Sequence, residues 1–168
     1  YGGSSTDLGN ATATDATGNV YITGYTSSAS AIATTGAYQT TFAGFYDVFI
    51  AKFNTSGAIL WATYYGGTSD DEGYGITTDG SGNVFVTGVT SSTAAIATSG
   101  TYQTVYGGGT YDAFLAKFSN SGSLQWATYY GGSGIEDGYG IGADGSGNIY
   151  ITGSTASTSG IATSGAYH

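Results

Sequence analysis

The strongest constraint on this chain is a ten-residue stretch that occurs three times. It reads DATGNVYITG from Asp15, DGSGNVFVTG from Asp79 and DGSGNIYITG from Asp144. The similarity extends well beyond these positions, because residues 52–102 align without a gap with residues 117–167 and 31 of the 51 positions are identical. The chain is therefore built from repeats of about 65 residues. Repeats of this kind stack on one another to bury a shared core.

Within each repeat the pattern predicts four antiparallel strands. Runs rich in Tyr, Thr, Val, Ile and Phe alternate with clusters of Gly, Ser, Asn and Asp, as in strands joined by tight turns. The composition agrees, with 31 Gly and 16 Tyr among 168 residues and no Pro. In the second repeat the expected strands are 73–78, 84–90, 111–118 and 124–130. The repeated ten-residue stretch is then the first hairpin of each unit, in which Gly and Asn occupy the turn.

These features predict an all-β fold of β-propeller-type blades, with one blade per repeat and about two and a half repeats present. We take the chain as one repeat region, divided into a partial unit 1–64, a full unit 65–129 and a partial unit 130–168. Two and a half blades cannot close a ring by themselves. We therefore expect the chain to be part of a longer propeller or repeat array, in which its blades contact neighbouring blades of that polypeptide or other copies of the chain.

The charge of the chain excludes several classes of function. Eleven acidic residues against two lysines give a formal net charge of −9. Nucleic-acid binding requires clustered Lys and Arg, so we do not expect a nucleic-acid partner. No window of eighteen consecutive apolar residues is present, so we expect no membrane insertion. The absence of Cys excludes disulfides, thiol catalysis and zinc sites that use Cys ligands.

The repeat resembles a known family. The motifs GNVYITG at 18–24, GAYQT at 36–40 and DAFLAKF at 112–118 are similar to those of the SBBP repeat family, named for a seven-bladed β-propeller of secreted and surface proteins of bacteria. The resemblance implies a propeller or a closely related stacked-blade architecture, export from the cell and no catalytic signature. It provides no functional residue that can be transferred to this chain.

Acidic residues next to the expected first strands are the candidates for a metal site. Asp70, Asp71 and Glu72 form the densest group, and Glu136 and Asp137 take their places in the next repeat. Adjacent carboxylates on an exposed loop can hold a hard cation, so weak calcium binding is one interpretation. The alternative is a solvated acidic loop. The Asp, Ser or Thr, and Asn residues of the hairpin turn also resemble part of a calcium loop, although the same residues stabilise turns without a metal.

Aromatic and basic residues give further candidates. Trp61 and Trp126 recur at one strand position and could stack on sugar rings, or they could pack between blades. Lys52 and Lys117 each follow an aspartate five residues earlier, on the opposite face of the strand, so we expect their partners in a neighbouring strand or blade. His168, the single histidine, is the last residue and has no companion for a catalytic triad.

Taken together, the sequence predicts a secreted or cell-surface scaffold or protein-interaction module without enzymatic activity or cofactor. Two alternatives remain. One is a propeller that binds carbohydrate or glycan, and the other is a structural subunit of an extracellular filament.

Overall fold

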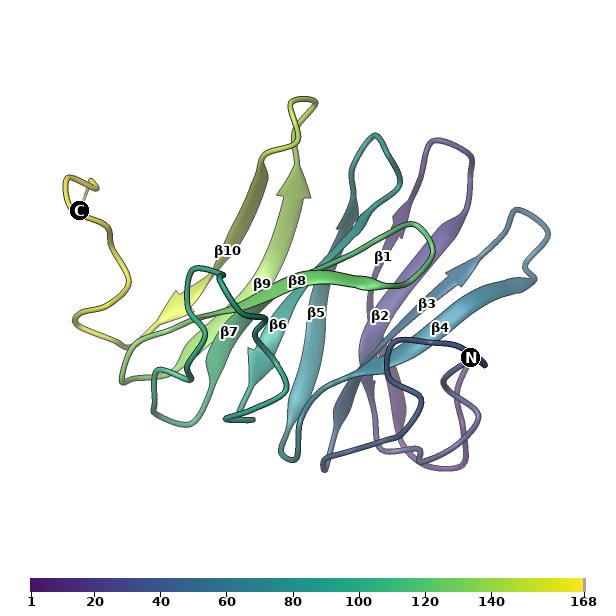
Figure 1. Ribbon diagram of the computed structural model, residues 1–168, viewed down its shortest axis with the longest axis horizontal. Helices are drawn as coiled ribbons and strands as arrows, with labels where there is room; N and C mark the ends of the chain where they lie inside the picture. Colours follow the sequence, from purple (N-terminus) through teal and green to yellow (C-terminus); the bar gives the residue numbers. More distant parts are fainter. Residues whose placement is uncertain (168) are drawn as a thin grey trace.

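The computed structural model describes residues 1–167, and in this range the protein is all-β with ten strands (Figure 1). The first unit forms β1 (Asp7–Thr14), β2 (Val20–Thr26), β3 (Asp47–Phe53) and β4 (Ile59–Tyr65). The second forms β5 (Asp71–Thr78), β6 (Val84–Thr90), β7 (Asp112–Phe118) and β8 (Leu124–Tyr130). The third unit contributes β9 (Glu136–Ala143) and β10 (Ile149–Thr155).

The strands form one antiparallel sheet per unit. Two sheets have four strands, in the orders β1-β2-β3-β4 and β5-β6-β7-β8, and the third contains β9 and β10. The predicted blade of four strands is confirmed, and β6 and β8 have the expected bounds. Strand β5 starts two residues earlier than predicted, because Asp71 and Glu72 pair with Thr90 and Val89 of β6.

The repeated stretch is a hairpin, as predicted. In the second unit Asp79 Oδ1 accepts hydrogen bonds from the Ser81 and Asn83 amides, both at 2.9 Å. Gly82 follows with a φ of 75°, a conformation that glycine adopts without strain. The stretch therefore consists of an Asp-centred turn and the first residues of the strand that follows.

The last glycine of the stretch has a different role. Gly88 in β6 pairs with a bulge in β5 between Gly73 and Gly75. A Cβ atom at position 88 would lie 1.9 Å from the Glu72 carbonyl oxygen, so no larger residue fits there. Equivalent bulges occur opposite Gly24 and Gly153. The glycine that ends each copy is thus required by the backbone of the neighbouring strand.

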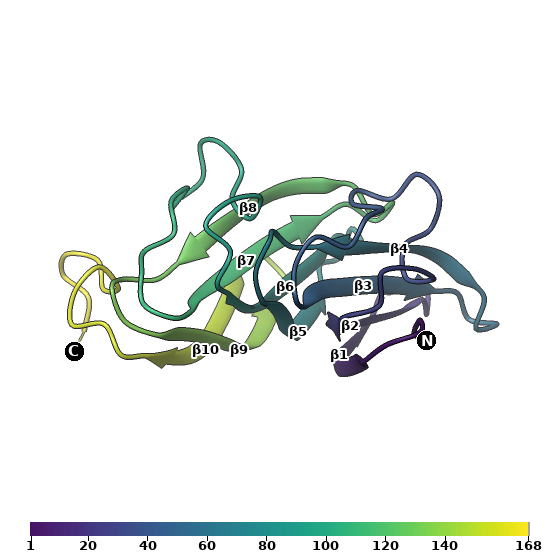
Figure 2. The ribbon, with the colours of Figure 1, turned by 90° about the horizontal axis from the view of Figure 1, so that it is seen from below.

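The three sheets pack face to face in chain order, with their first strands β1, β5 and β9 in contact (Figure 1). Side chains from the two complete blades share one core that includes Tyr65, Val86, Phe114 and Phe118. Every residue of β6 is buried, because this strand has a strand on each side and a blade on each face. Most of β10 is exposed. The long β2–β3 and β6–β7 connections lie on one side of the blades (Figure 2).

Candidate functional site

The acidic residues that begin β5 and β9 are buried. Asp71 is 0% exposed and Glu136 is 1% exposed, each at the first position of its strand. The Asp71 carboxylate accepts hydrogen bonds from the Thr90 hydroxyl, from the Ser92 hydroxyl (2.8 Å) and from the Gly67 amide (2.8 Å). The interpretation of this segment as a solvated acidic loop is therefore wrong for these two positions. The neighbours of these residues in the sequence are mostly polar, whereas the packing of adjacent blades excludes water from Asp71.

The other candidates of this group face away from these two carboxylates. Glu72 accepts from the Tyr74 hydroxyl at 2.9 Å, and Asp137 accepts from the hydroxyls of Tyr139 and Ser154, both at 2.9 Å. Adjacent strand residues point to opposite faces of the sheet, so Asp71 and Glu72 do not converge on one point. Asp70 lies just before β5 and forms a parallel bridge with Tyr46 of the first blade.

A second set of carboxylates begins the third strand of each blade. Asp47 and Asp112 are both 0% exposed. Asp47 Oδ2 accepts from the Ala43 amide (3.0 Å) and the Gln39 side chain (2.9 Å), and its Oδ1 accepts from the Gly44 amide (3.1 Å). This aspartate therefore organises the end of the long β2–β3 connection.

These carboxylates form one like-charged pair at each junction between blades. Burial raises the pKa of Asp47, Asp71 and Asp112 to about 6, since removal from water disfavours the charged form. The neighbouring Asp47 raises the pKa of Asp71 further, and Glu136 does the same for Asp112. Glu136 itself has a lowered pKa. Burial opposes the shift, but hydrogen bonds from Ser157, Thr155 and Gly132 outweigh it.

Asp112 differs from Asp47 in one respect. Its Oδ2 accepts from the Gly107 amide (2.6 Å) and from Gln103 (3.3 Å), whereas its buried Oδ1 has no hydrogen-bond partner among the described residues. The sequence explains the difference, because eight positions separate Gln39 from Asp47 and nine separate Gln103 from Asp112. The extra residue in the β6–β7 connection leaves Oδ1 without the direct hydrogen bond that the Gly44 amide makes to Asp47, although the Gly108 amide lies near enough to lower the pKa of Asp112.

The turn aspartates accept hydrogen bonds from several donors of their own turns. Asp15 accepts from the Thr17 and Asn19 amides, both at 3.0 Å, from the Asn19 side chain (2.8 Å) and from the Tyr21 hydroxyl (3.0 Å). Burial alone would raise the pKa of Asp15, but these hydrogen bonds outweigh it and hold the pKa below its usual value. The arrangement is that of a side-chain-stabilised turn, in agreement with the non-metal interpretation.

Trp61 and Lys52 connect the first blade to the second. Trp61 Nε1 donates to the Asn120 carbonyl at 2.9 Å, and Lys52 Nζ donates to the Asn120 side-chain oxygen. Lys52 also lies 3.5 Å from the Asp15 carboxylate. A Cβ atom at Gly122 would lie 2.8 Å from the Trp61 ring, so this glycine covers the indole. Trp61 thus packs between blades, and Lys52 finds its partners outside its own strand, as predicted.

Trp126 and Lys117 occupy the same positions in the second blade. Trp126 packs against Phe85 with ring centroids 6.2 Å apart, and Lys117 Nζ lies 5.1 Å above the Phe85 ring. Within residues 1–167 no counterpart of Asn120 lies over them. The part played by Asn120 was not anticipated from the sequence, because Thr55 takes its position in the first unit and the repeat therefore does not reveal it.

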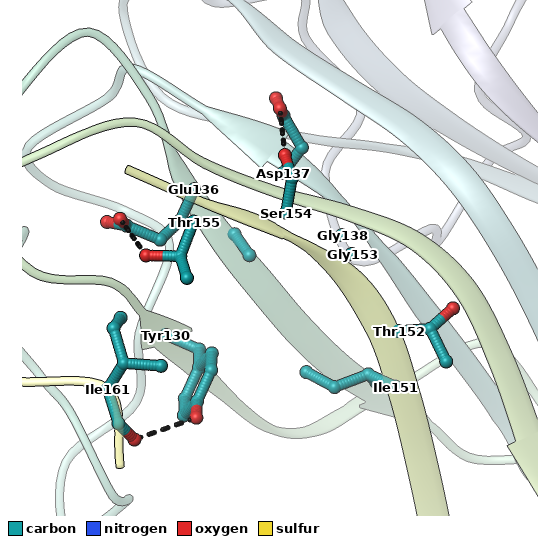
Figure 3. A pocket seen from close by; sticks show the side chains of 11 residues that line it. Tyr130, Glu136, Asp137, Gly138, Ile151, Thr152, Gly153, Ser154, Thr155 and Ile161 are labelled. Atoms are coloured by element: carbon teal, nitrogen blue, oxygen red, sulfur yellow. Dashed lines mark hydrogen bonds between the residues drawn. The ribbon is translucent and has the colours of Figure 1, made fainter. Parts of the chain in front are cut away.

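An open groove lies between β8 and β10. It is lined by Tyr130, Ile151 and Ile161, and the Tyr130 hydroxyl donates to the Ile161 carbonyl at 2.9 Å (Figure 3). Glu136 lies at one end of the groove, where it accepts from the Thr155 hydroxyl at 2.8 Å. A further hollow of about 390 Å³ continues past Tyr130 towards Tyr102.

Among residues 1–167, no three side chains of Asp, Glu, His or Cys gather so that they could hold a metal ion. Weak calcium binding by the residues at 70–72 and 136–137 stays an untested interpretation. His168 lies outside the described residues. In the part of the chain that the structure describes, no helix has the length and apolar character needed to cross a membrane.

Comparison with known proteins identifies one family. A family model described as SBBP, a beta-propeller repeat, matches residues 60–93 and 125–161. The two matches begin in β4 and β8 and each continues through the first hairpin of the next unit. No curated protein matches the chain.

Proposed function

Because this chain carries β-propeller repeats of the SBBP family, we propose that it serves as a secreted or cell-surface scaffold that binds a protein partner and has no enzymatic activity. The buried carboxylates support a structural role, since they accept hydrogen bonds from the chain itself and organise the junctions between blades. A propeller of this kind presents variable loops on constant blades.

The observation that carries the proposal is the exposure of apolar side chains on the two long connections. Phe45 is 75% exposed in the β2–β3 connection, and Val105 is 71% exposed in the β6–β7 connection. Both connections lie on the same side of the blades (Figure 2). Their sequences, TFAGFYD and VYGGGTYD, differ more than the strands do. Exposed aromatic and aliphatic side chains on adjacent loops are typical of the anchors of protein interfaces.

The test is a partner-capture experiment with three forms of the chain. Immobilised protein is incubated with extracellular proteins of the source organism, and the bound proteins are identified. We expect a partner that the double variant Phe45→Ala/Val105→Ala no longer retains. The control variant Ile59→Ala removes an exposed strand side chain (42% exposed) and should retain it. A partner that all three forms retain equally would contradict recognition by these loops.

A second candidate function is glycan binding, favoured by a hollow of about 380 Å³ beside Trp61. It is lined by the polar residues Thr34, Thr35, Thr63 and Ser121, a composition that suits a sugar ring. Gly122 already covers one face of Trp61, so a sugar would contact the remaining indole edge. A panel of sugars that leaves the fluorescence of the chain unchanged, with the variant Trp61→Phe as the reference, would remove this candidate.

A further inference from the structure

The groove beside β10 has a filled counterpart in each complete blade. In the second blade the residues at the same repeat positions are Tyr65, Val86 and Ile96, and Phe114 and Phe118 of β7 share their buried core. The Tyr65 ring lies 5.4 Å from Phe114 and 5.7 Å from Phe118, measured between centroids. The Tyr65 hydroxyl donates to the Ile96 carbonyl at 2.9 Å, as Tyr130 does to Ile161.

The first blade repeats the arrangement. Tyr1 donates to the Ile32 carbonyl, and its ring lies 5.6 Å from both Phe49 and Phe53 of β3. In both complete blades, therefore, a tyrosine hydroxyl donates to an isoleucine carbonyl. The ring of that tyrosine packs against two phenylalanines that lie four residues apart on the third strand. The third tyrosine of the series, Tyr130, is already held on Ile161 in the same way, and its groove is open (Figure 3).

The strand next to this groove, β10, also has an outer edge that is unpaired within residues 1–167. In the second blade, β6 pairs on its outer side with β7, so that Gly88 lies opposite Phe114 and Val84 opposite Phe118. Among the described residues β10 pairs only with β9. Its outer edge is consequently a row of unpaired backbone groups beside an apolar groove, the arrangement that accepts an added strand.

A third set of contacts joins the β7–β8 turn of the second blade to the first blade. In the second blade the β7–β8 turn places Asn120 over Trp61 and Lys52 of the first blade. Tyr38 of the first blade meets Phe118 of the second, with centroids 6.0 Å apart. The second blade has the equivalents of Trp61, Lys52 and Tyr38, which are Trp126, Lys117 and Tyr102. The Tyr102 and Tyr130 rings lie 6.0 Å apart at the side of the groove.

We propose that the outer edge of β10 and the groove lined by Tyr130, Ile151 and Ile161 form a docking site for a β-hairpin of a further repeat unit, whose first strand carries two phenylalanines four residues apart. Its phenylalanines fill the groove against Tyr130, and its turn covers Trp126 and Lys117. The hairpins of a second copy of this chain are not the occupant, because β3–β4 and β7–β8 are already paired within their own sheets. The site is separate from the loop residues Phe45 and Val105, so either proposal can fail without the other.

The probe is a synthetic peptide of residues 111–130, which has the sequence of the β7–β8 hairpin. Calorimetric titration into the 168-residue chain should show saturable binding of one peptide per chain. Hydrogen exchange should slow at residues 149–155 on binding, which places the peptide on β10. A peptide with Phe114→Ala and Phe118→Ala should bind about tenfold more weakly or worse, because the two phenylalanine rings supply much of the apolar surface that binding buries.

Variants of the chain give the matched control. Ile151→Ser in the groove should weaken binding of the unaltered peptide, whereas Phe45→Ala, on the β2–β3 connection, should not. Equal binding of the two peptides, or unchanged exchange in β10, would overturn the proposal. Protection of β10 that appears without peptide and grows with protein concentration would assign the surface to a second copy.

A tethered form makes the test independent of the peptide's own affinity. Joining the peptide sequence to residue 168 through a flexible linker gives an effective concentration in roughly the millimolar range. Slowed exchange at residues 149–155 in this form, lost when the two phenylalanines are replaced by alanine, supports the docking site. Fast exchange in both forms overturns it.

Discussion

Replacing Asp112 by asparagine should stabilise the protein at neutral pH. The Asp112 side chain is 0% exposed, its neighbour Glu136 carries the same charge, and its pKa is raised to about 6 against a usual value of 3.8. The folded state therefore binds a proton more tightly than the unfolded state does. Stability falls as the pH rises from about 4 through 6, and it stays low above that. At about 1.4 kcal/mol for each pKa unit, the shift of about two units sets an upper limit of roughly 3 kcal/mol on this cost at pH 7.5, and screening by nearby solvent reduces it.

Asparagine removes this cost without losing a hydrogen bond. Its amide oxygen can take the place of Oδ2, which accepts from Gly107 and Gln103, and its NH₂ group takes the place of Oδ1, which has no partner among the described residues. We expect Asp112→Asn to raise the free energy of unfolding by about 1–2 kcal/mol at pH 7.5 and to change it little at pH 4, where the aspartate is protonated.

Urea unfolding followed by far-ultraviolet circular dichroism at pH 4.0 and pH 7.5 measures both values. Asp47→Asn is the matched control. Both Asp47 oxygens accept hydrogen bonds from N–H groups, so the new NH₂ group would face a donor and cost roughly 1–3 kcal/mol at pH 4. A loss of stability in Asp112→Asn at pH 7.5, or an effect of equal size at both pH values, would show that the Asp112 charge does not destabilise the folded protein.

Three further predictions test other parts of the structure. Gly88→Ala should destabilise the chain by about 3 kcal/mol or prevent folding, because the added Cβ would lie 1.9 Å from the Glu72 carbonyl oxygen. In thermal unfolding the control variant Gly80→Ala should be nearly neutral, because no atom lies within 4 Å of its added Cβ. Asn120→Ala should cost roughly 1–2 kcal/mol in urea unfolding, since Lys52 loses the side-chain oxygen that accepts its hydrogen bond on the second blade. A calcium chelator should leave the melting temperature unchanged, because the buried Asp71 carboxylate already accepts three hydrogen bonds. A lower melting temperature with chelator would instead establish a bound cation.

The strands and their turns could be predicted from the sequence because their causes are local. Alternating side chains and an Asp–Ser–Asn turn specify a hairpin wherever they occur, and three copies of the same hairpin leave little choice of architecture. The burial of β6 on both faces also followed, since a blade among blades has no free face. The sequence shows that glycine recurs at position 88 and its equivalents but gives no reason for it. The bulge in β5 opposite Gly88 supplies the reason.

The candidate site depended on contacts between units, which a repeat pattern cannot specify. Asp71 looks like a surface residue in its own segment, but the packing of the first blade against the second buries it beside Asp47. Trp61 and Trp126 are equivalent in sequence, yet Asn120 and Gly122 of the next blade cover only Trp61. The sequence by itself determined the blade, because hairpins arise from neighbouring residues. Only the tertiary structure decided which carboxylates lose their water and which groove stays open, because both depend on what the next blade places against them.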